Sequence, residues 1–201
     1  MQTIEFIKTQ LTSVFNSIDV KIAKTVSQVM ALIVLRGGFN IWPELLQFLT
    51  GNLGVDCFTS DTETNRVNLS IVENSIHTIA IIIEDCSKMF EDMKFRGLIT
   101  EMFPPICKLI NPSYNQTIVS NAINSINILL LTNAEIVLQN MEEYLNVLLN
   151  IGTQIYQQNQ NESSSGGAQS NQKVKWRVVQ GITTIMELKM TSIIDRFEVV
   201  C

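Results

Sequence analysis

The chain has little of what most enzymes and metal proteins need. Its 201 residues include one histidine, His77, and four cysteines, at positions 57, 86, 107 and 201, that share no metal-ligand spacing. No serine or cysteine motif accompanies the histidine. The neighbouring carboxylates Glu84 and Asp85 point about 100° apart on a helix and cannot share an ion. We therefore expect a non-enzymatic protein without a metal or cofactor.

Charge and long apolar runs are also scarce. Charged residues make up 16% of the chain, the net charge is −5, and no block of lysine or arginine is long enough to follow a phosphate backbone. No apolar run approaches the ~20 residues that span a bilayer, and the N-terminus does not resemble a secretion signal. We expect no direct nucleic-acid ligand, no membrane contact, reduced cysteines, and a location in the cytosol or nucleus.

What the chain does have is one apolar pattern, with offsets of 0, 4, 8 and 11, that occurs four times. Such offsets lie on one face of an α-helix, and each set is preceded by another apolar helix, so the sequence predicts stacked helix pairs. The intervals are 49, 47 and 56 residues, and removing a polar tract of about 16 residues from the last leaves about 40, so these periods bracket the ~40–47 residues of HEAT and armadillo repeats. The four sets are Ile22, Val26, Met30 and Ile33; Ile71, Ser75, Ile79 and Ile82; Ile118, Ala122, Ile126 and Leu129; and Val174, Val178, Ile182 and Ile185.

The expected fold is all-α, a right-handed superhelical solenoid of antiparallel, HEAT/armadillo-like helix pairs. Asp19 predicts a helix start and Gly37-Gly38 a helix stop, while Pro104-Pro105 either kinks a helix or marks its start. Both chain ends resemble cuts through a longer solenoid, because neither carries a polar capping repeat. We expect repeats at 1–38, 41–92, 95–131 and 133–190 with another starting at 192–201, helices at 3–16, 19–35, 42–54, 69–90, 95–110, 113–131, 133–156 and 174–190, a polar loop at 55–68, and a disordered Gln/Asn/Ser/Gly insertion at 157–172.

Stacked helix pairs offer long surfaces to partner proteins, so the helix sides opposite the core are the candidate sites. Helix geometry alone places His77 and Asn124 on such sides, together with Ser120 and Asn127. Trp176 also lies there, and an exposed indole either packs or binds. On the first helix of the fourth pair, Tyr144, Leu145 and Leu148 either pack or line a hydrophobic groove that accepts a partner's aromatic side chain.

Several short runs, in order and at matching spacing, resemble the N-terminal HEAT repeats of the importin-beta (karyopherin-beta) family. The resemblance covers nearly all of the chain except 55–68 and 157–172. The chain departs from this family at one position. HEAT repeats usually carry a basic residue directly after the first apolar residue of the second helix, but only one of the four second helices does so here. The usual Asp–Arg ladder between repeats is therefore largely missing. The matching runs are Phe6-Ile7-Lys8, Ile22-Ala23-Lys24-Thr25-Val26, Trp42-Pro43-Glu44-Leu45-Leu46, Glu84-Asp85-Cys86-Ser87, Phe103-Pro104 and Glu187-Leu188-Lys189-Met190.

This resemblance implies a nuclear transport receptor that shuttles between cytoplasm and nucleus. In that family the N-terminal repeats bind the GTP form of Ran through second helices on a concave face, where Glu73, Glu84 and Asp85 are the matching acidic positions. The groove at Tyr144, Leu145 and Leu148 would contact phenylalanine-glycine nucleoporins, and cargo proteins would bind a C-terminal part that this chain lacks. The alternatives are a generic HEAT-repeat scaffold or regulatory subunit, and an enzyme whose site is completed by further sequence.

Overall fold

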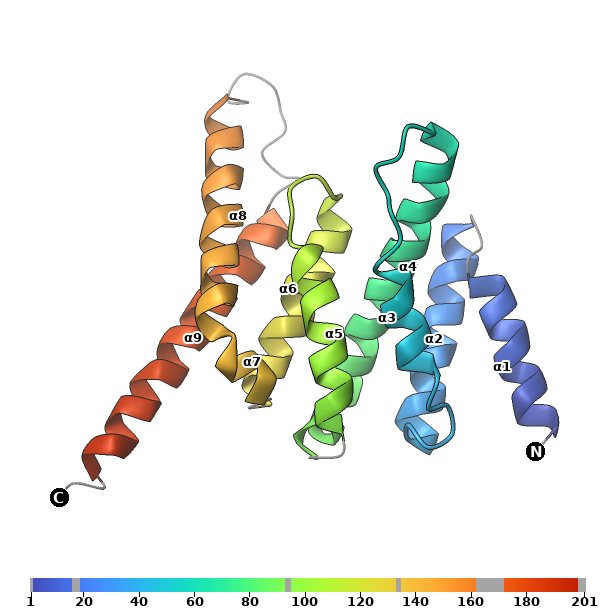
Figure 1. Ribbon diagram of the computed structural model, residues 1–201, viewed down its shortest axis with the longest axis horizontal. Coiled ribbons are helices and arrows are strands. Elements are labelled where there is room, and N and C mark those ends of the chain that lie inside the picture. Colours follow the sequence, from blue (N-terminus) through green and yellow to red (C-terminus); the bar gives the residue numbers. More distant parts are fainter. Residues whose placement is uncertain (1, 16–18, 93–94, 133–134, 162–171, 199–201) are drawn as a thin grey trace. The chain divides into compact units, whose positions relative to one another are not determined.

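The computed structural model describes residues 2–15, 19–92, 95–132, 135–161 and 172–198, and these contain helices and turns but no strand. Within each of two compact units the helices pack against one another, which is consistent with a helical solenoid (Figure 1). Two compact units divide the chain, the first ending at Met89 and the second beginning at Phe90. The predicted all-α class is confirmed, and the handedness of the superhelix stays a prediction. Over the described ranges, no helix has the length and apolarity needed to cross a membrane.

The first unit holds two helix pairs, α1 (Gln2–Phe15) with α2 (Val20–Gly37), and α3 (Leu45–Asn52) with α4 (Thr62–Asp85). The Asp19 carboxylate accepts hydrogen bonds from the backbone N–H groups of Lys21 and Ile22 and so caps α2. Gly38 ends that helix with a φ of 71°, in the left-handed region that favours glycine. The sequence predicted both boundaries within two residues.

In the first unit the two helices of each pair pack against each other, and the second helix of one pair also packs against the second helix of the other. α1 packs on α2, α3 on α4, and α4 on α2. The rings of Phe15 and Phe48 meet edge to face with centroids 5.7 Å apart. The amide of Asn74 on α4 donates to the backbone carbonyl of Phe15, 3.3 Å away, and the Asn52 amide donates to the Ser75 hydroxyl at 3.1 Å.

The second unit repeats this arrangement. A 3₁₀ helix, η1 (Ser87–Glu91), precedes α5 (Arg96–Lys108) and α6 (Gln116–Leu131). Then come α7 (Glu135–Gln139), α8 (Met141–Asn161) and the long α9 (Gln172–Glu198). Helix α5 packs on α6, α8 on α9, and α9 also lies along α6. Asn115 caps α6 by accepting from the Ile118 N–H.

Several of the predicted boundaries are wrong. Helix α4 starts at Thr62 and ends at Asp85, so the loop predicted at 55–68 stops at its capping residue Asp61. The single helix predicted at 133–156 is two helices, α7 and α8, and α8 continues through part of the predicted disordered tract to Asn161. Helix α9 runs unbroken past position 190. The helix predicted at 95–110 is confirmed as α5, and because Pro104 and Pro105 lie inside it, the alternative that they mark its start is excluded. Residues 133 and 162–171 lie outside the described part.

The fourfold apolar pattern marks buried faces on three of the four second helices. Ile118, Ala122, Ile126 and Leu129 are fully buried, and most members of the sets on α4 and α9 are buried too. On α2 the pattern is only half right, because Ile22 is 45% exposed. There the buried side carries smaller residues, Ala23, Ser27 and Ala31, which let α4 approach closely.

Candidate protein-binding surfaces

The C-terminal half of α4 carries a mostly acidic surface. Glu73, His77 and Glu84 are spaced by four and seven residues, which places them on one side of the helix. Glu73 and His77 are half-buried, whereas Glu84 and Asp85 are exposed. The structure therefore brings three of the predicted partner-binding residues together on one side, with Asp85 next to them at the helix end.

The carboxylates of Glu84 and Asp85 lie at a helix end where negative charge is unfavourable. The C-terminal end of a helix carries partial negative charge, and the last turn of α4 contains no basic residue. Asp85 also acts on its neighbour, because burial raises the pKa of the Cys86 thiol and the Asp85 charge raises it further. Two exposed acids at a helix C-terminus cost helix stability, which fits a role outside the folding of α4.

Asn124, predicted to face a partner, is only 6% exposed, and Ser120 and Asn127 on the same helix are 1% exposed. This part of the predicted surface is wrong in the described structure. The reason is clearest at Asn127, whose side-chain amide donates to the backbone carbonyl of Arg177 on α9 at 3.0 Å. The second helix of one pair covers that side of the second helix before it.

The three residues of the predicted groove on α8 are mostly core residues. Tyr144 and Leu148 are fully buried and Leu145 is half-buried, so packing is the alternative that the structure favours. The Tyr144 hydroxyl donates to the Asn127 side-chain oxygen at 2.9 Å, and burial raises the pKa of Tyr144 well above its usual range. No open groove exists at Tyr144 and Leu148 in the described structure.

Helix α9 carries an exposed apolar surface that the sequence pattern only partly revealed. Trp176 is 66% exposed, and Val179 and Met186 on the same side are 56% and 62% exposed. The surface is hollowed beside Trp176 into an open cavity of about 710 Å³, bordered by Lys173, Lys175 and Val179. The sequence identifies Trp176 as a candidate, but not Val179 and Met186, because these two residues lie opposite the apolar pattern that predicts the helix.

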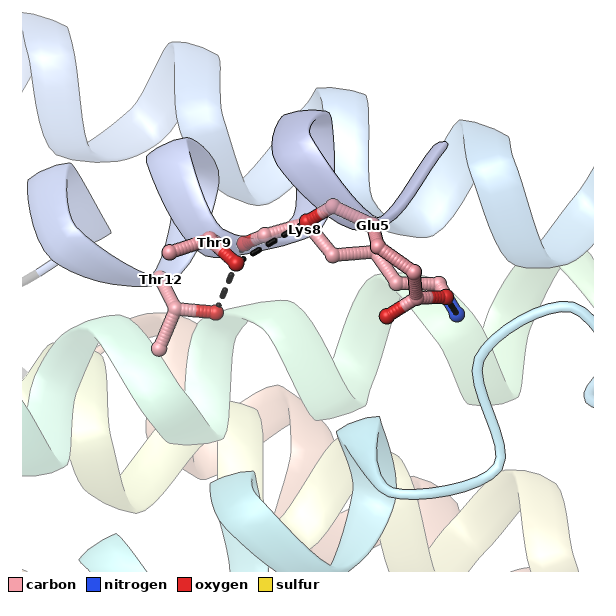
Figure 2. Close-up of polar contacts among 4 residues, drawn as sticks. All are labelled: Glu5, Lys8, Thr9 and Thr12. Carbon is pink, nitrogen blue, oxygen red and sulfur yellow. Dashed lines mark hydrogen bonds and ion pairs between the residues drawn. The ribbon is translucent and has the colours of Figure 1, made fainter. Parts of the chain in front are cut away.

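A smaller cavity of about 300 Å³ lies between α1 and the C-terminal end of α2. Its walls are aliphatic, and Lys8 and Arg36 border it. Figure 2 shows that Lys8 lies on the same side of α1 as Glu5, with which it forms an ion pair of 2.7 Å. The Thr9 and Thr12 hydroxyls donate to backbone carbonyls four residues earlier, so the polar groups on this side of α1 are satisfied within the helix. The aliphatic residues are Ile4, Ile7, Ile33 and Ile41.

The cysteines are free thiols where the structure describes them. Cys57 and Cys86 are buried and Cys107 is half-buried. Burial, with the Glu143 charge adding to it, raises the pKa of Cys107 to about 12. Within the described residues, no three His, Cys, Asp or Glu side chains group closely enough to hold a metal ion.

Each unit is thus built from helix pairs in which one second helix packs on the next, and several helix sides are exposed. No family model matches the chain. Among curated proteins it is similar to transportin from Dictyostelium discoideum, with 24% identity over 140 residues, 70% of this chain. The aligned part spans 14% of the length of that transportin. The similarity supports a distant relationship to importin-beta-like receptors.

Proposed function

We propose that this chain is part of a nuclear transport receptor that carries protein cargo through the nuclear pore without catalysis. The observation that carries the proposal is the combination of all-α stacked pairs with similarity to a transportin over 70% of the chain. Its cargo would bind a part of the receptor outside these residues, and the receptor would shuttle between cytoplasm and nucleus.

In this proposal the acidic end of α4 contributes to binding the GTP form of Ran. Glu84 and Asp85 are exposed and have no basic neighbour in the last turn of α4, so they can pair with basic residues of a GTPase. Glu73 and His77 continue the same side toward the middle of the helix. Asn124 is not part of this surface because it is buried.

Nucleoporin contact is the second part of the proposal. Since Tyr144 and Leu148 are buried, the aliphatic cavity between α1 and α2 is a better place for a phenylalanine side chain than the surface of α8. Ile7→Glu would place a charge in this cavity, and we expect it to reduce binding of a phenylalanine-glycine repeat peptide. Leu149→Glu on α8 is the control, since Leu149 is 48% exposed and Ile7 is 44% exposed, and it should not reduce binding of the peptide.

The test of the Ran assignment is nucleotide dependence. The chain is titrated in a calorimeter with Ran loaded with GDP or with a non-hydrolysable GTP analogue. We expect the GTP form to bind at least about tenfold more tightly, a difference of about 1.4 kcal/mol. Equal binding of both forms, or binding of neither, would count against the assignment and favour a generic HEAT-repeat scaffold.

A further inference from the structure

The loop between α3 and α4 is held in one shape by side chains of α4. The Asn65 side-chain oxygen accepts hydrogen bonds from the Thr59 N–H at 2.7 Å and from the Thr59 hydroxyl at 2.8 Å, and its amide donates to the Thr59 carbonyl at 2.8 Å. The Asn68 amide donates to the Asp56 carbonyl. Both asparagines lie in the first two turns of α4, so the loop has a defined position against that helix.

Ser60 lies in this loop, and its hydroxyl makes no hydrogen bond to any residue that the structure describes. The run from Ser60 to Glu63 has the form of a capping box, in which the serine would cap the helix. The structure gives that role to Asp61, whose carboxylate accepts hydrogen bonds from the Glu63 N–H and the Thr64 hydroxyl. The exposed Ser60 hydroxyl therefore has no part in holding the fold together.

The sequence around Ser60 is acidic. Residues 37–65 include four carboxylates and no lysine or arginine. Asp61 directly follows Ser60, and Glu63 comes three residues after it. A protein kinase selects its substrates partly by matching the charges around the acceptor hydroxyl. This context excludes kinases that need a basic residue before the serine or a proline after it, and it fits a kinase whose substrate groove is lined by lysine and arginine.

Glutamate follows other hydroxyl residues at the same spacing of three, but those hydroxyls are less accessible. Thr184 is 6% exposed, and its hydroxyl donates to a backbone carbonyl of its own helix. The Thr132 hydroxyl likewise donates to the Leu129 carbonyl. Ser70 is half-buried within α4. Of these four residues, Ser60 alone combines an exposed side chain, a free hydroxyl and a position outside a helix.

We propose that Ser60 is a phosphorylation site of an acid-directed protein kinase. In this reaction the Ser60 Oγ atom attacks the γ-phosphorus of a nucleoside triphosphate, and the bond from that phosphorus to the β–γ bridging oxygen breaks. The nucleoside diphosphate leaves, and the hydroxyl proton passes to a base of the kinase. The phosphate adds a charge of about −1.5 to −2 at pH 7 to a segment that already contains Asp56, Asp61 and Glu63.

The phosphate would leave α4 folded. The N-terminal end of a helix carries partial positive charge, which favours a phosphate, while the charges of Asp56 and Asp61 oppose it, so the two effects partly cancel. The first basic residue after Ser60 is Arg66, which already pairs with Glu63 at 3.1 Å. The phosphate therefore stays available to an arginine cluster of a partner protein.

This site is independent of the proposed Ran surface. Ser60 precedes α4 and Glu84 lies at its other end, and a helix of 24 residues is about 36 Å long. That length exceeds the screening distance of ~8 Å at physiological salt. Phosphorylation of Ser60 should therefore leave any binding of Ran unchanged, and failure of either proposal says nothing about the other.

The experiment treats the purified full chain with ATP and an acid-directed kinase, and mass spectrometry counts and locates the phosphate. We expect one phosphate per chain, on Ser60, and Ser60→Ala should reduce its incorporation at least about tenfold. Thr62→Ala is the matched control, because Thr62 is also exposed with a free hydroxyl but is followed at the same spacing by the neutral Asn65. This control should be phosphorylated as the unaltered chain is.

Two further variants test the requirement for negative charge. Asp61→Asn keeps a helix cap and Glu63→Gln keeps the side-chain shape, yet each removes one charge near Ser60. Each should slow incorporation about fivefold or more, while circular dichroism at pH 7 shows a folded chain. The phosphorylated chain should melt within about 3 °C of the unmodified chain. No incorporation, phosphate on Thr62 instead of Ser60, undiminished rates for both charge variants, or loss of the folded state on phosphorylation would overturn the proposal.

Discussion

The side-chain amide of Asn127 on α6 donates a 3.0 Å hydrogen bond to the backbone carbonyl of Arg177 on α9. The carbonyl oxygen of the same side chain accepts from the Tyr144 hydroxyl of α8, so one residue joins three helices. A buried amide with both ends satisfied fixes the register of its neighbours, because any slip would leave polar atoms unpaired. Asn127 is therefore a central residue of the second unit.

Asn127→Ala is expected to destabilise the second unit by about 1–3 kcal/mol, because it removes two buried hydrogen bonds, although the Tyr144 hydroxyl keeps the Ile123 carbonyl as an acceptor at 3.3 Å. Urea unfolding followed by circular dichroism measures the loss. Asn150→Ala is the control, since Asn150 is exposed on α8, and it should change stability by about 0.5 kcal/mol or less. Equal effects of the two substitutions would contradict the account.

Two glycines at the α8–α9 contact should respond oppositely to alanine. At Gly181 a β-carbon would meet Asn127 Oδ1 at 2.5 Å and Leu148 Cδ1 at 2.7 Å, so Gly181→Ala should destabilise by about 1–3 kcal/mol. At Gly152 the nearest atom is Val178 Cγ1 at 3.5 Å, an ordinary contact. Gly152→Ala should stabilise by about 0.5–1 kcal/mol through helix propensity. Thermal melts of both variants decide the matter, and a destabilising Gly152→Ala would show that the packing is different.

Stability should fall at alkaline pH, partly through Cys107. The pKa of this thiol is about 12 in the folded chain against an ordinary 9.0, so the unfolded state loses its proton first as the pH rises. The protonated thiol contributes its full stability below pH 9, and that contribution disappears as the pH rises toward 12. Cys107→Ser, whose hydroxyl does not titrate in this range, should show a smaller decline in urea midpoint between pH 8 and pH 10. An unchanged decline would rule out this role for Cys107.

At acid pH the capping residue Asp61 should matter. Hydrogen bonds from the Thr64 hydroxyl and the Glu63 N–H lower the pKa of Asp61 below its ordinary 3.8. The ionised cap therefore stabilises α4 above the unfolded pKa, and the contribution is lost as the pH falls through the lower folded value. Asp61→Asn also caps but does not titrate. Between pH 7 and pH 3 the urea midpoint should fall more for the unaltered chain than for the variant, and the reverse order would refute this explanation.

Helix boundaries were predictable where a capping residue or proline marked them. Asp19 with Gly38 gives bounds of α2 close to those observed, and the break at Pro112 gives a start of α6 three residues before the observed Gln116, whose cap Asn115 was not predicted. The signal at Asp61-Thr62-Glu63 was missed because the polar composition of 55–68 was weighed instead. The break at Asn140 carries neither glycine nor proline, so periodicity alone could not reveal it. Glutamines extend α8 to Asn161, since glutamine favours helix despite its polarity.

The candidate surfaces were less predictable, because burial depends on what the neighbouring helix does. Asn127 and Trp176 belong to equivalent helices, and both were placed opposite the core. The first is 1% exposed beneath α9 and the second is 66% exposed. A helix wheel of one segment cannot tell these cases apart, since the difference lies in whether another described helix covers that side, as α9 covers α6. Glu84 and Asp85 were found correctly as exposed because they end their helix.

The most direct test of the proposed role is charge reversal at the end of α4. Lysines at positions 84 and 85 favour the negative end of the helix, so Glu84→Lys with Asp85→Lys should leave the melting temperature unchanged or raise it. The same variant should bind GTP-loaded Ran at least about tenfold more weakly than the unaltered chain. Glu101→Lys with Glu143→Lys, exposed positions on α5 and α8 with the same change in net charge, is the control and should bind normally. Undiminished binding by the α4 variant would contradict the account.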